Sequence, residues 1–263
     1  FVFILYNLKM NLGFIGTGKI SSSVIKGICK SNIKYKRITI SYRNKKISEE
    51  LKNNFKKVYI SKNNQEIIDK SNWVFLAVTP KVGKKILKNL KFKENQTIIS
   101  FISTITLIEL KKIIKVKSDI VRAIPLPPIA LKKGPVPICP PNKKVKIFFD
   151  KIGSTIEIKN EKLSINFWST SGMMASYYRM LNVMSDWLVR KGIKRKDAQR
   201  YITSLFLALS EDAVVSSKKD LKYLVKESQT PKGLNEQGLK EMSKKNVYKS
   251  VINTLNSIHK RLS

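Results

Sequence analysis

The sequence predicts an α/β domain built on a doubly wound parallel sheet, followed by an all-helical domain. Over the first 160 of the 263 residues, short apolar runs alternate with amphipathic stretches, and this rhythm of strand and helix is typical of a parallel sheet. From Glu161 onward, apolar residues recur at helical spacing. We therefore expect an α/β domain over residues 10–160 and a helical domain over residues 161–263.

Short apolar runs in the first domain are expected to be strands, with amphipathic helices between them. The first run is apolar throughout, as expected for a strand that is covered on both faces of the sheet. The expected strands are Leu12–Ile15, Ile38–Ser41, Val58–Ile60, Trp73–Val78, Thr97–Ser100 and Ile120–Ile124. The expected helices are Ser21–Ser31, Ser48–Asn54, Asn64–Lys70, Val82–Leu90 and Leu107–Ile114.

A cluster of prolines follows the last of these strands. Because proline lacks an N–H and fixes φ, we expect this segment to form neither regular helix nor central strand. The apolar residues Phe148, Phe149, Ile152, Ile156 and Ile158 then indicate one more helix and strand. The prolines are Pro125, Pro127, Pro128, Pro135, Pro137, Pro140 and Pro141.

The helical domain is expected to contain long amphipathic helices with apolar and aromatic stripes. Asp197–Ser217 and Val247–Leu262 are two such segments, and Gly192 is a typical stop for the helix before them. This surplus of apolar side chains favours a homodimer or a higher homo-oligomer. The stripe before Gly192 consists of Met174, Tyr177, Tyr178, Leu181, Met184 and Leu188, with Met173 and Trp187 beside it.

Composition excludes several classes of function. The net charge of +34 comes mostly from lysines, which are spread over every segment, and the chain has eight arginines. It has no motif of a familiar nucleic-acid-binding fold, so we expect no specific nucleic-acid partner. His259 is the one histidine, which excludes histidine triads and histidine metal clusters. Cys29 and Cys139 form neither a disulfide framework nor a metal-binding spacing, so no metal is expected.

The sequence indicates a cytoplasmic protein. Two cysteines without a disulfide pattern fit a reducing compartment, and no run approaches the roughly 18 apolar residues that a membrane span needs. The apolar opening Phe1–Tyr6 lacks a basic flank and a cleavage site, so we do not interpret it as a signal peptide. Because Met10 directly precedes the first strand, residues 1–9 are interpreted as a translation-start artefact.

A glycine-rich loop joins the first expected strand to the first helix. Its spacing, Gly16-x-Gly18-x-x-Ser21, fits the dinucleotide fingerprint with serine at the third position. In that pattern the first glycine permits a tight turn, and the second lets the backbone approach a pyrophosphate at the helix N-terminus. An ordinary glycine-rich turn is the alternative. The residues expected to bind the cofactor here are Gly13, Ile15, Gly16, Thr17, Gly18, Lys19 and Ile20.

The end of the second strand distinguishes the two nicotinamide dinucleotides. A carboxylate at this position would bind the ribose hydroxyls of NAD(H), but the sequence here has no acid. Ser41, Arg43 and Asn44 offer hydrogen-bond donors to a 2′-phosphate, with Arg43 supplying a planar charged group. NADP(H) is therefore favoured over NAD(H). A solvated basic turn in a basic protein is the alternative.

Several further motifs, together with the glycine loop, resemble the pyrroline-5-carboxylate reductase family. The resemblance runs in order over nearly the whole chain from Met10, and the order and spacing of the motifs carry it. The motifs are Gly13-Phe14-Ile15-Gly16-Thr17-Gly18-Lys19, Leu76-Ala77-Val78-Thr79-Pro80, Val121-Arg122-Ala123-Ile124-Pro125 with Pro128, Ser169-Thr170-Ser171-Gly172 and Thr230-Pro231-Lys232-Gly233.

The resemblance implies hydride transfer from NAD(P)H to a cyclic imine by a dimer of Rossmann and helical domains. It places Ala77, Val78, Thr79 and Pro80 near the nicotinamide ribose, and Ile124 and Pro125 beside the nicotinamide. The loop from Thr230 to Glu236 would hold a substrate carboxylate through backbone amides. The residues implied at the substrate are Thr230, Lys232, Gly233 and Asn235.

The departures from the family lie at the substrate end. Family members have Pro-Asn-Thr-Pro where this chain has Pro125-Leu126-Pro127-Pro128, and Ser-Pro-Gly-Gly-Thr-Thr where it has Thr230-Pro231-Lys232-Gly233-Leu234-Asn235. Since a site built for hydrogen bonding discriminates strongly, these changes are expected to alter the substrate while the chemistry is kept. Lys232 would favour a more acidic substrate, and Asn235 would donate near the ring nitrogen.

Two other functions remain open. A 3-hydroxyacid dehydrogenase relative shares the glycine loop and a helical second half, but its Gly-x-x-x-Lys-x-x-x-Asn pattern is absent, since Ser176 and Met180 stand at the fourth and eighth positions after Gly172. The altered substrate motifs are also compatible with a non-catalytic NADP-binding sensor or interaction protein on a Rossmann scaffold.

Overall fold

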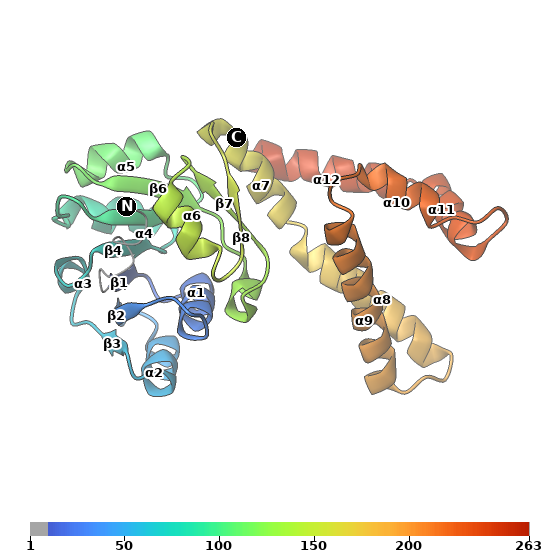
Figure 1. Ribbon diagram of the computed structural model, residues 1–263, viewed down its shortest axis with the longest axis horizontal. Coiled ribbons are helices and arrows are strands. Elements are labelled where there is room, and N and C mark those ends of the chain that lie inside the picture. Colours follow the sequence, from blue (N-terminus) through green and yellow to red (C-terminus); the bar gives the residue numbers. More distant parts are fainter. Residues whose placement is uncertain (1–9, 263) are drawn as a thin grey trace. The chain divides into compact units, whose positions relative to one another are not determined.

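The computed structural model describes residues 10–262, which form two compact units (Figure 1). The first extends to Trp168 and the second begins at Ser169. The interpretation of residues 1–9 as a start artefact concerns a segment that lies outside the described residues.

The first unit is built on one eight-stranded sheet in the order β3-β2-β1-β4-β5-β6-β7-β8. All neighbouring strands are parallel except β6 and β7, which are antiparallel. This arrangement confirms the expected doubly wound sheet. The strands are β1 (Met10–Ile15), β2 (Tyr35–Ile40), β3 (Val58–Ile60), β4 (Trp73–Leu76), β5 (Thr97–Ser100), β6 (Asp119–Ala123), β7 (Pro135–Cys139) and β8 (Ser154–Glu157).

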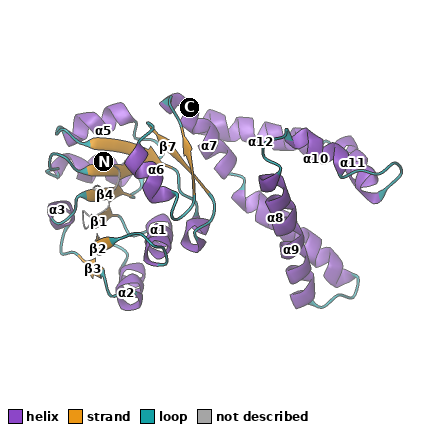
Figure 2. Ribbon diagram, viewed as in Figure 1, coloured by secondary structure: helices purple, strands orange, loops and turns teal. Residues whose placement is uncertain are grey.

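Helices cover the sheet and give it two separate cores (Figure 2). Phe75 of β4 belongs to one core, whereas its neighbours Val74 and Leu76 belong to the other, as the two-residue period of a strand requires. The helices are α1 (Lys19–Cys29), α2 (Lys45–Asn54), α3 (Asn64–Asp69), α4 (Pro80–Ile86), η2 (Leu87–Asn89), α5 (Leu107–Ile114), η3 (Pro127–Leu131), α6 (Lys143–Phe149) and η4 (Glu161–Leu163).

The expectation that the proline cluster contains no central strand is wrong, because β7 lies between β6 and β8. Pro137 accepts a hydrogen bond from Ile124 N–H (N···O 3.0 Å), at the point where β6 ends. Pro137 has no N–H to donate, but it lies where the ladder between β6 and β7 ends, so the missing donor does not break the ladder. Towards β8, the carbonyls of Gly134 and Ile138 accept from Ser154 and Ile158, so the prolines interrupt neither ladder.

The second unit is entirely helical, as expected. The first long pair, α8 and α9, is joined by a short turn at Gly192 and packs through Tyr177 and Phe206, whose ring centroids are 6.2 Å apart. No helix within residues 10–262 is both long and apolar enough to cross a bilayer. The helices are α7 (Ser164–Ser171), which enters the unit, α8 (Met174–Arg190), α9 (Arg195–Val215), α10 (Leu221–Glu227), α11 (Leu234–Lys244) and α12 (Val247–Leu262).

The first compact unit includes the start of α7. Residues 161–168 belong to the first unit because Glu161 and Trp168 both contact the buried side chain of Arg122 in β6. Helix α7 therefore starts on the α/β unit and ends in the helical one.

Replacing Phe75 by alanine should destabilise the first unit strongly. Its ring is fully buried and stacks on Phe14, with 4.3 Å between centroids. Truncating a buried phenylalanine removes apolar contacts and leaves a cavity, which costs about 3–5 kcal/mol in the free energy of unfolding. Urea unfolding followed by circular dichroism measures this loss. Ile108→Ala is the control, since Ile108 is 65% exposed and its truncation should change stability by less than about 1 kcal/mol.

Candidate functional site

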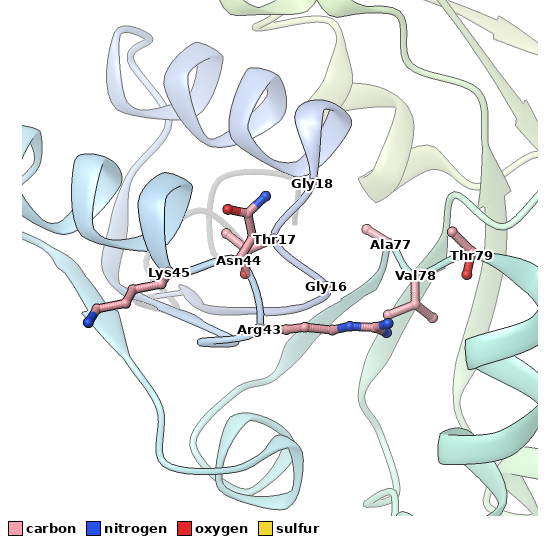
Figure 3. Close-up of a pocket in the computed structure, with 9 residues that line it drawn as sticks. All are labelled: Gly16, Thr17, Gly18, Arg43, Asn44, Lys45, Ala77, Val78 and Thr79. Carbon is pink, nitrogen blue, oxygen red and sulfur yellow. The ribbon is translucent and has the colours of Figure 1, made fainter.

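An open cavity of about 400 Å³ lies where the strand order reverses, at the carboxyl ends of β1 and β4 (Figure 3). Ligands of doubly wound sheets bind at such a switch point, because the loops after the two central strands diverge there. The cavity is lined by Gly16, Thr17, Gly18, Arg43, Asn44, Lys45, Ala77, Val78 and Thr79. The structure thus brings together three segments predicted from sequence to bind the cofactor.

The two glycines of the loop meet different requirements. Gly16 has a φ of +101°, and a Cβ there would lie 2.5 Å from the carbonyl oxygen of Ala77. Gly18 is the N-cap of α1, and a Cβ there would meet no protein atom within 4 Å. Gly16 is therefore required by the turn and the neighbouring strand, whereas Gly18 leaves open space in front of the helix N-terminus, where a phosphate is favoured. Ser21 donates to Gly16 O at 2.6 Å and closes the loop from within.

Ser41 and Thr17 are turned towards each other. The Ser41 hydroxyl accepts from Gly16 N–H at 3.0 Å and lies 2.9 Å from Thr17 Oγ1, which donates to Ser41 O. Both side chains are buried. These bonds join the glycine loop to the end of β2. They fix the position of the glycine loop relative to the residues near Arg43.

The end of β2 carries positive charge without a neighbouring acid. Among residues 10–262, Arg43 has no ion-pair partner, and Figure 3 shows its side chain extending towards Val78 while Lys45 points outward. Asn44 caps α2, its side chain accepting from Ile47 N–H at 3.3 Å. A guanidinium left free in this position suits an anionic group of a ligand.

A second, smaller cavity adjoins the first and contains residues that the sequence analysis missed. Asn64 is the first residue of α3, which follows β3 after a short loop, and Val82 and Ile86 lie on α4. The sequence signal for Asn64 was its place after a predicted strand, because the carboxyl ends of parallel strands share one edge of the sheet. The cavity is lined by Gly16, Ser41, Arg43, Asn64, Val78, Val82 and Ile86.

Other residues predicted to bind the cofactor line neither of these cavities. Gly13 lies within β1, where a Cβ would collide with Ser71 and Ile67, so its role is to let α3 approach the strand. Ile15 belongs to the core. The remaining ones occupy the first turns of helices or the end of β6, and they are Lys19, Ile20, Pro80, Ile124 and Pro125.

The loop proposed for the substrate precedes α11 in the helical unit. Lys232 adopts a left-handed conformation (φ +61°), and its N–H donates to the Glu236 carboxylate at 2.6 Å. The N–H of Gly233 bonds Thr230 O at 2.8 Å, and the Asn235 side chain donates to Ser228 O. The amides of Lys232 and Gly233 and the side chain of Asn235 are thus used within the loop.

Glu236 is charged at neutral pH. Hydrogen bonds from Lys240 and from the Lys232 N–H hold the pKa of its carboxyl below the ordinary value. The N-terminus of α11 therefore already carries an internal anion at a position where a helix favours negative charge.

Comparison with known proteins agrees with both units. Residues 11–104 match a family model described as NADP oxidoreductase coenzyme F420-dependent, and residues 162–263 match one described as pyrroline-5-carboxylate reductase dimerisation. Pyrroline-5-carboxylate reductase 2 of Bacillus subtilis is 22% identical over 260 residues, covering 95% of this chain and 93% of that protein.

Solved structures of similar proteins have the same fold. Pyrroline-5-carboxylate reductase from Streptococcus pyogenes has a TM-score of 0.81 at 24% identity, covering 97% of this chain and 98% of that one. The enzyme from Plasmodium falciparum, with NADP bound, has a TM-score of 0.82 at 22% identity, covering 98% and 97%. With a dinucleotide loop at the switch point, the α/β unit matches an NADP oxidoreductase family model and the helical unit matches the pyrroline-5-carboxylate reductase dimerisation model, and the chain is similar to pyrroline-5-carboxylate reductases over nearly its whole length.

Proposed function

We propose that the protein is an NADPH-dependent reductase of a cyclic imine, with pyrroline-5-carboxylate, which yields proline, or a related imine as its substrate. The observation that carries this proposal is the cavity at the switch point, with space in front of Gly18 and an unpaired Arg43 at the end of β2. The family relationship supplies the reaction class, and the protein of Plasmodium falciparum supports NADP as the cofactor.

The residues around the cavity fit a phosphorylated dinucleotide. Gly18 and the first turn of α1 would bind the pyrophosphate, and Arg43 with Asn44 would bind the 2′-phosphate. Ala77 to Thr79 would lie along the nicotinamide ribose. No acid stands between Ser41 and Lys46 to bind a free 2′-hydroxyl, which favours NADP(H) over NAD(H).

Imine reduction requires the protein mainly to align the cofactor with the substrate. The reduced nicotinamide supplies the hydride, and the substrate can arrive already protonated on its ring nitrogen. The chain must then orient two reactants and exclude water, which suits a site without histidine. Thr230, Lys232 and the backbone amides at the start of α11 would hold a substrate carboxylate that displaces the Glu236 carboxylate or binds beside it.

The helical unit supports a homodimer or a higher homo-oligomer. Within residues 169–262 only Ser169, Ser185, Ala198 and Ile202 are buried, so these helices bury little apolar surface against each other. Trp187 and Tyr201 are more than half exposed. A second copy would cover such side chains.

We also assign the protein to the cytoplasm, on the basis of its two cysteines, which form no disulfide.

The direct test is NADPH oxidation, followed at the nicotinamide absorbance band. Pyrroline-5-carboxylate is compared with 1-pyrroline and a panel of other cyclic imines. Oxidation with any imine supports the reaction class and identifies the substrate. NADPH binding without turnover of any imine would contradict the proposal and favour the sensor function.

Replacing Arg43 by alanine should weaken NADPH binding selectively. A hydrogen bond to a charged group contributes about 1.5–3 kcal/mol, so the dissociation constant for NADPH should rise about tenfold or more, while that for NADH stays nearly unchanged. Fluorescence titration of both cofactors measures this. Lys46→Ala, which removes a neighbouring charge outside the two cavity linings, is the matched control. An equal loss for the two cofactors would argue against a 2′-phosphate site at Arg43.

Replacing Glu236 by alanine should improve the use of pyrroline-5-carboxylate. The change frees the Lys232 amide and removes a negative charge from the N-terminus of α11. Charge effects at a helix terminus are about 0.3–1 kcal/mol, so KM for pyrroline-5-carboxylate should fall about two- to fivefold. KM for 1-pyrroline, which has no carboxylate, should not change. Glu241→Ala, which removes a carboxylate farther along the same helix, is the control, and a similar gain in that variant would refute this role of the loop.

A further inference from the structure

Arg122 is the buried charged residue of the first unit. Its side chain is 5% exposed, and no other charged side chain among residues 10–262 is buried to this degree. It lies in β6, two residues before Ile124 and at the carboxyl edge of the sheet. This is the edge at which the cofactor cavity opens, because β1, β4, β5 and β6 are parallel.

The guanidinium joins its own strand, β6, to two other segments, the loop after β5 and residues 161–168. One terminal nitrogen pairs with the Glu161 carboxylate. The other donates to the carbonyls of Ser103 and Ile102, which follow β5. The planar face lies over the indole of Trp168, with 4.6 Å from Cζ to the ring centroid. A planar group with several fixed donors can satisfy all three at once.

Glu161 extends this network to a fourth segment. The oxygen that pairs with Arg122 also accepts from Leu107 N–H at 2.8 Å, at the first residue of α5. The ion pair therefore joins β6, the loop after β5, the start of α5 and the segment that leads into the helical unit. Because Arg122 is buried and Glu161 is only 22% exposed, removing the carboxylate would leave the guanidinium without its charge partner inside the unit.

The network reaches the cofactor cavity through Ile102. The backbone of Ile102 accepts from Arg122, and its side chain lies against Gly83 of α4, where a Cβ would be 3.0 Å away. Helix α4 starts at Pro80, directly after the cavity residues Ala77 to Thr79.

We infer that Arg122 is a positioning residue for hydride transfer. Through Ile102 and Glu161 it fixes the segments that follow β4, β5 and β6 relative to residues 161–168. This inference rests on the proposed reductase function. It assigns to Arg122 the alignment of the nicotinamide end of the site, with no contact to cofactor or substrate. Binding of the adenosine end, at Gly18 and Arg43, does not depend on it.

The test compares Arg122→Lys and Glu161→Gln with the wild-type protein. Arg122→Lys keeps a charge for Glu161 but loses the stacking and the forked bonds to the two carbonyls. We expect kcat at saturating NADPH and imine to fall about 10- to 100-fold, the effect of a small misalignment, while the dissociation constant for NADPH changes less than about twofold. Glu161→Gln should act in the same direction.

A variant in the other core of the unit separates positioning from stability. Ile28→Ala in α1 removes a fully buried side chain from the core to which Ile102 does not belong, and it should lower the melting temperature without lowering kcat for the folded protein. If Arg122→Lys retained wild-type kcat, or lost NADPH affinity and kcat in the same proportion, the positioning role would be refuted.

Amide hydrogen exchange provides a readout that does not need turnover. In Arg122→Lys, exchange should increase in residues 101–107, 124–131 and 161–168 and remain unchanged in residues 13–22, whereas Ile28→Ala should increase it throughout the unit. If the wild-type protein reduced no imine, the proposed function would fail, and the exchange pattern would still decide whether Arg122 holds these segments together. A uniform increase in Arg122→Lys would overturn the inference.

Discussion

The reversal of strand order between β1 and β4 is the constraint on which the rest of the site depends. Both strands are covered on two faces and are mostly apolar, and ligands of such sheets bind beyond the carboxyl ends of the strands. The turn after β1 passes so close to Ala77 that a side chain at Gly16 would collide with its carbonyl. One close approach thus determines where the glycine loop, the start of α1 and the residues after β4 converge.

The α/β unit was largely predictable because its signals are local. Val58–Ile60, Thr97–Ser100 and Leu107–Ile114 begin and end where the apolar pattern predicted. The strand β7, which contains Pro135 and Pro137, was not predictable. It can contain proline because its hydrogen-bonded ladder with β6 ends at Ile124, opposite Pro137, and the sequence does not show this pairing. Pairing between distant segments is not visible in a local pattern, and for the same reason the contacts of Arg122 with Glu161 and Trp168 could not be predicted.

The candidate site was predictable in part. Gly16, Gly18 and Arg43 could be named because a spacing of glycines and the absence of an acid after β2 carry direct chemical meaning. The sequence predicts that Ser41 binds a phosphate, and in the structure its hydroxyl accepts a hydrogen bond from the Gly16 amide, which the sequence did not predict. Asn64 and Ile86 come from separate elements and line the smaller cavity only through the three-dimensional arrangement of β3, α3 and α4. A side chain's direction is set by packing, which the sequence pattern does not specify.

The two helix N-termini proposed to bind ligands, one in each unit, differ in what their backbone offers a ligand. At Gly18 the first turn of α1 faces open space, so its amides remain available to a ligand. At the start of α11 the amides of Lys232 and Gly233 are bonded within the loop, one of them to the charged Glu236. A substrate carboxylate would have to displace an anion of the same sign or bind beside it, and Lys240 already pairs with that anion. If the proposed function holds, substitutions in this loop would change the competition for a helix terminus without changing the residues that bind the cofactor.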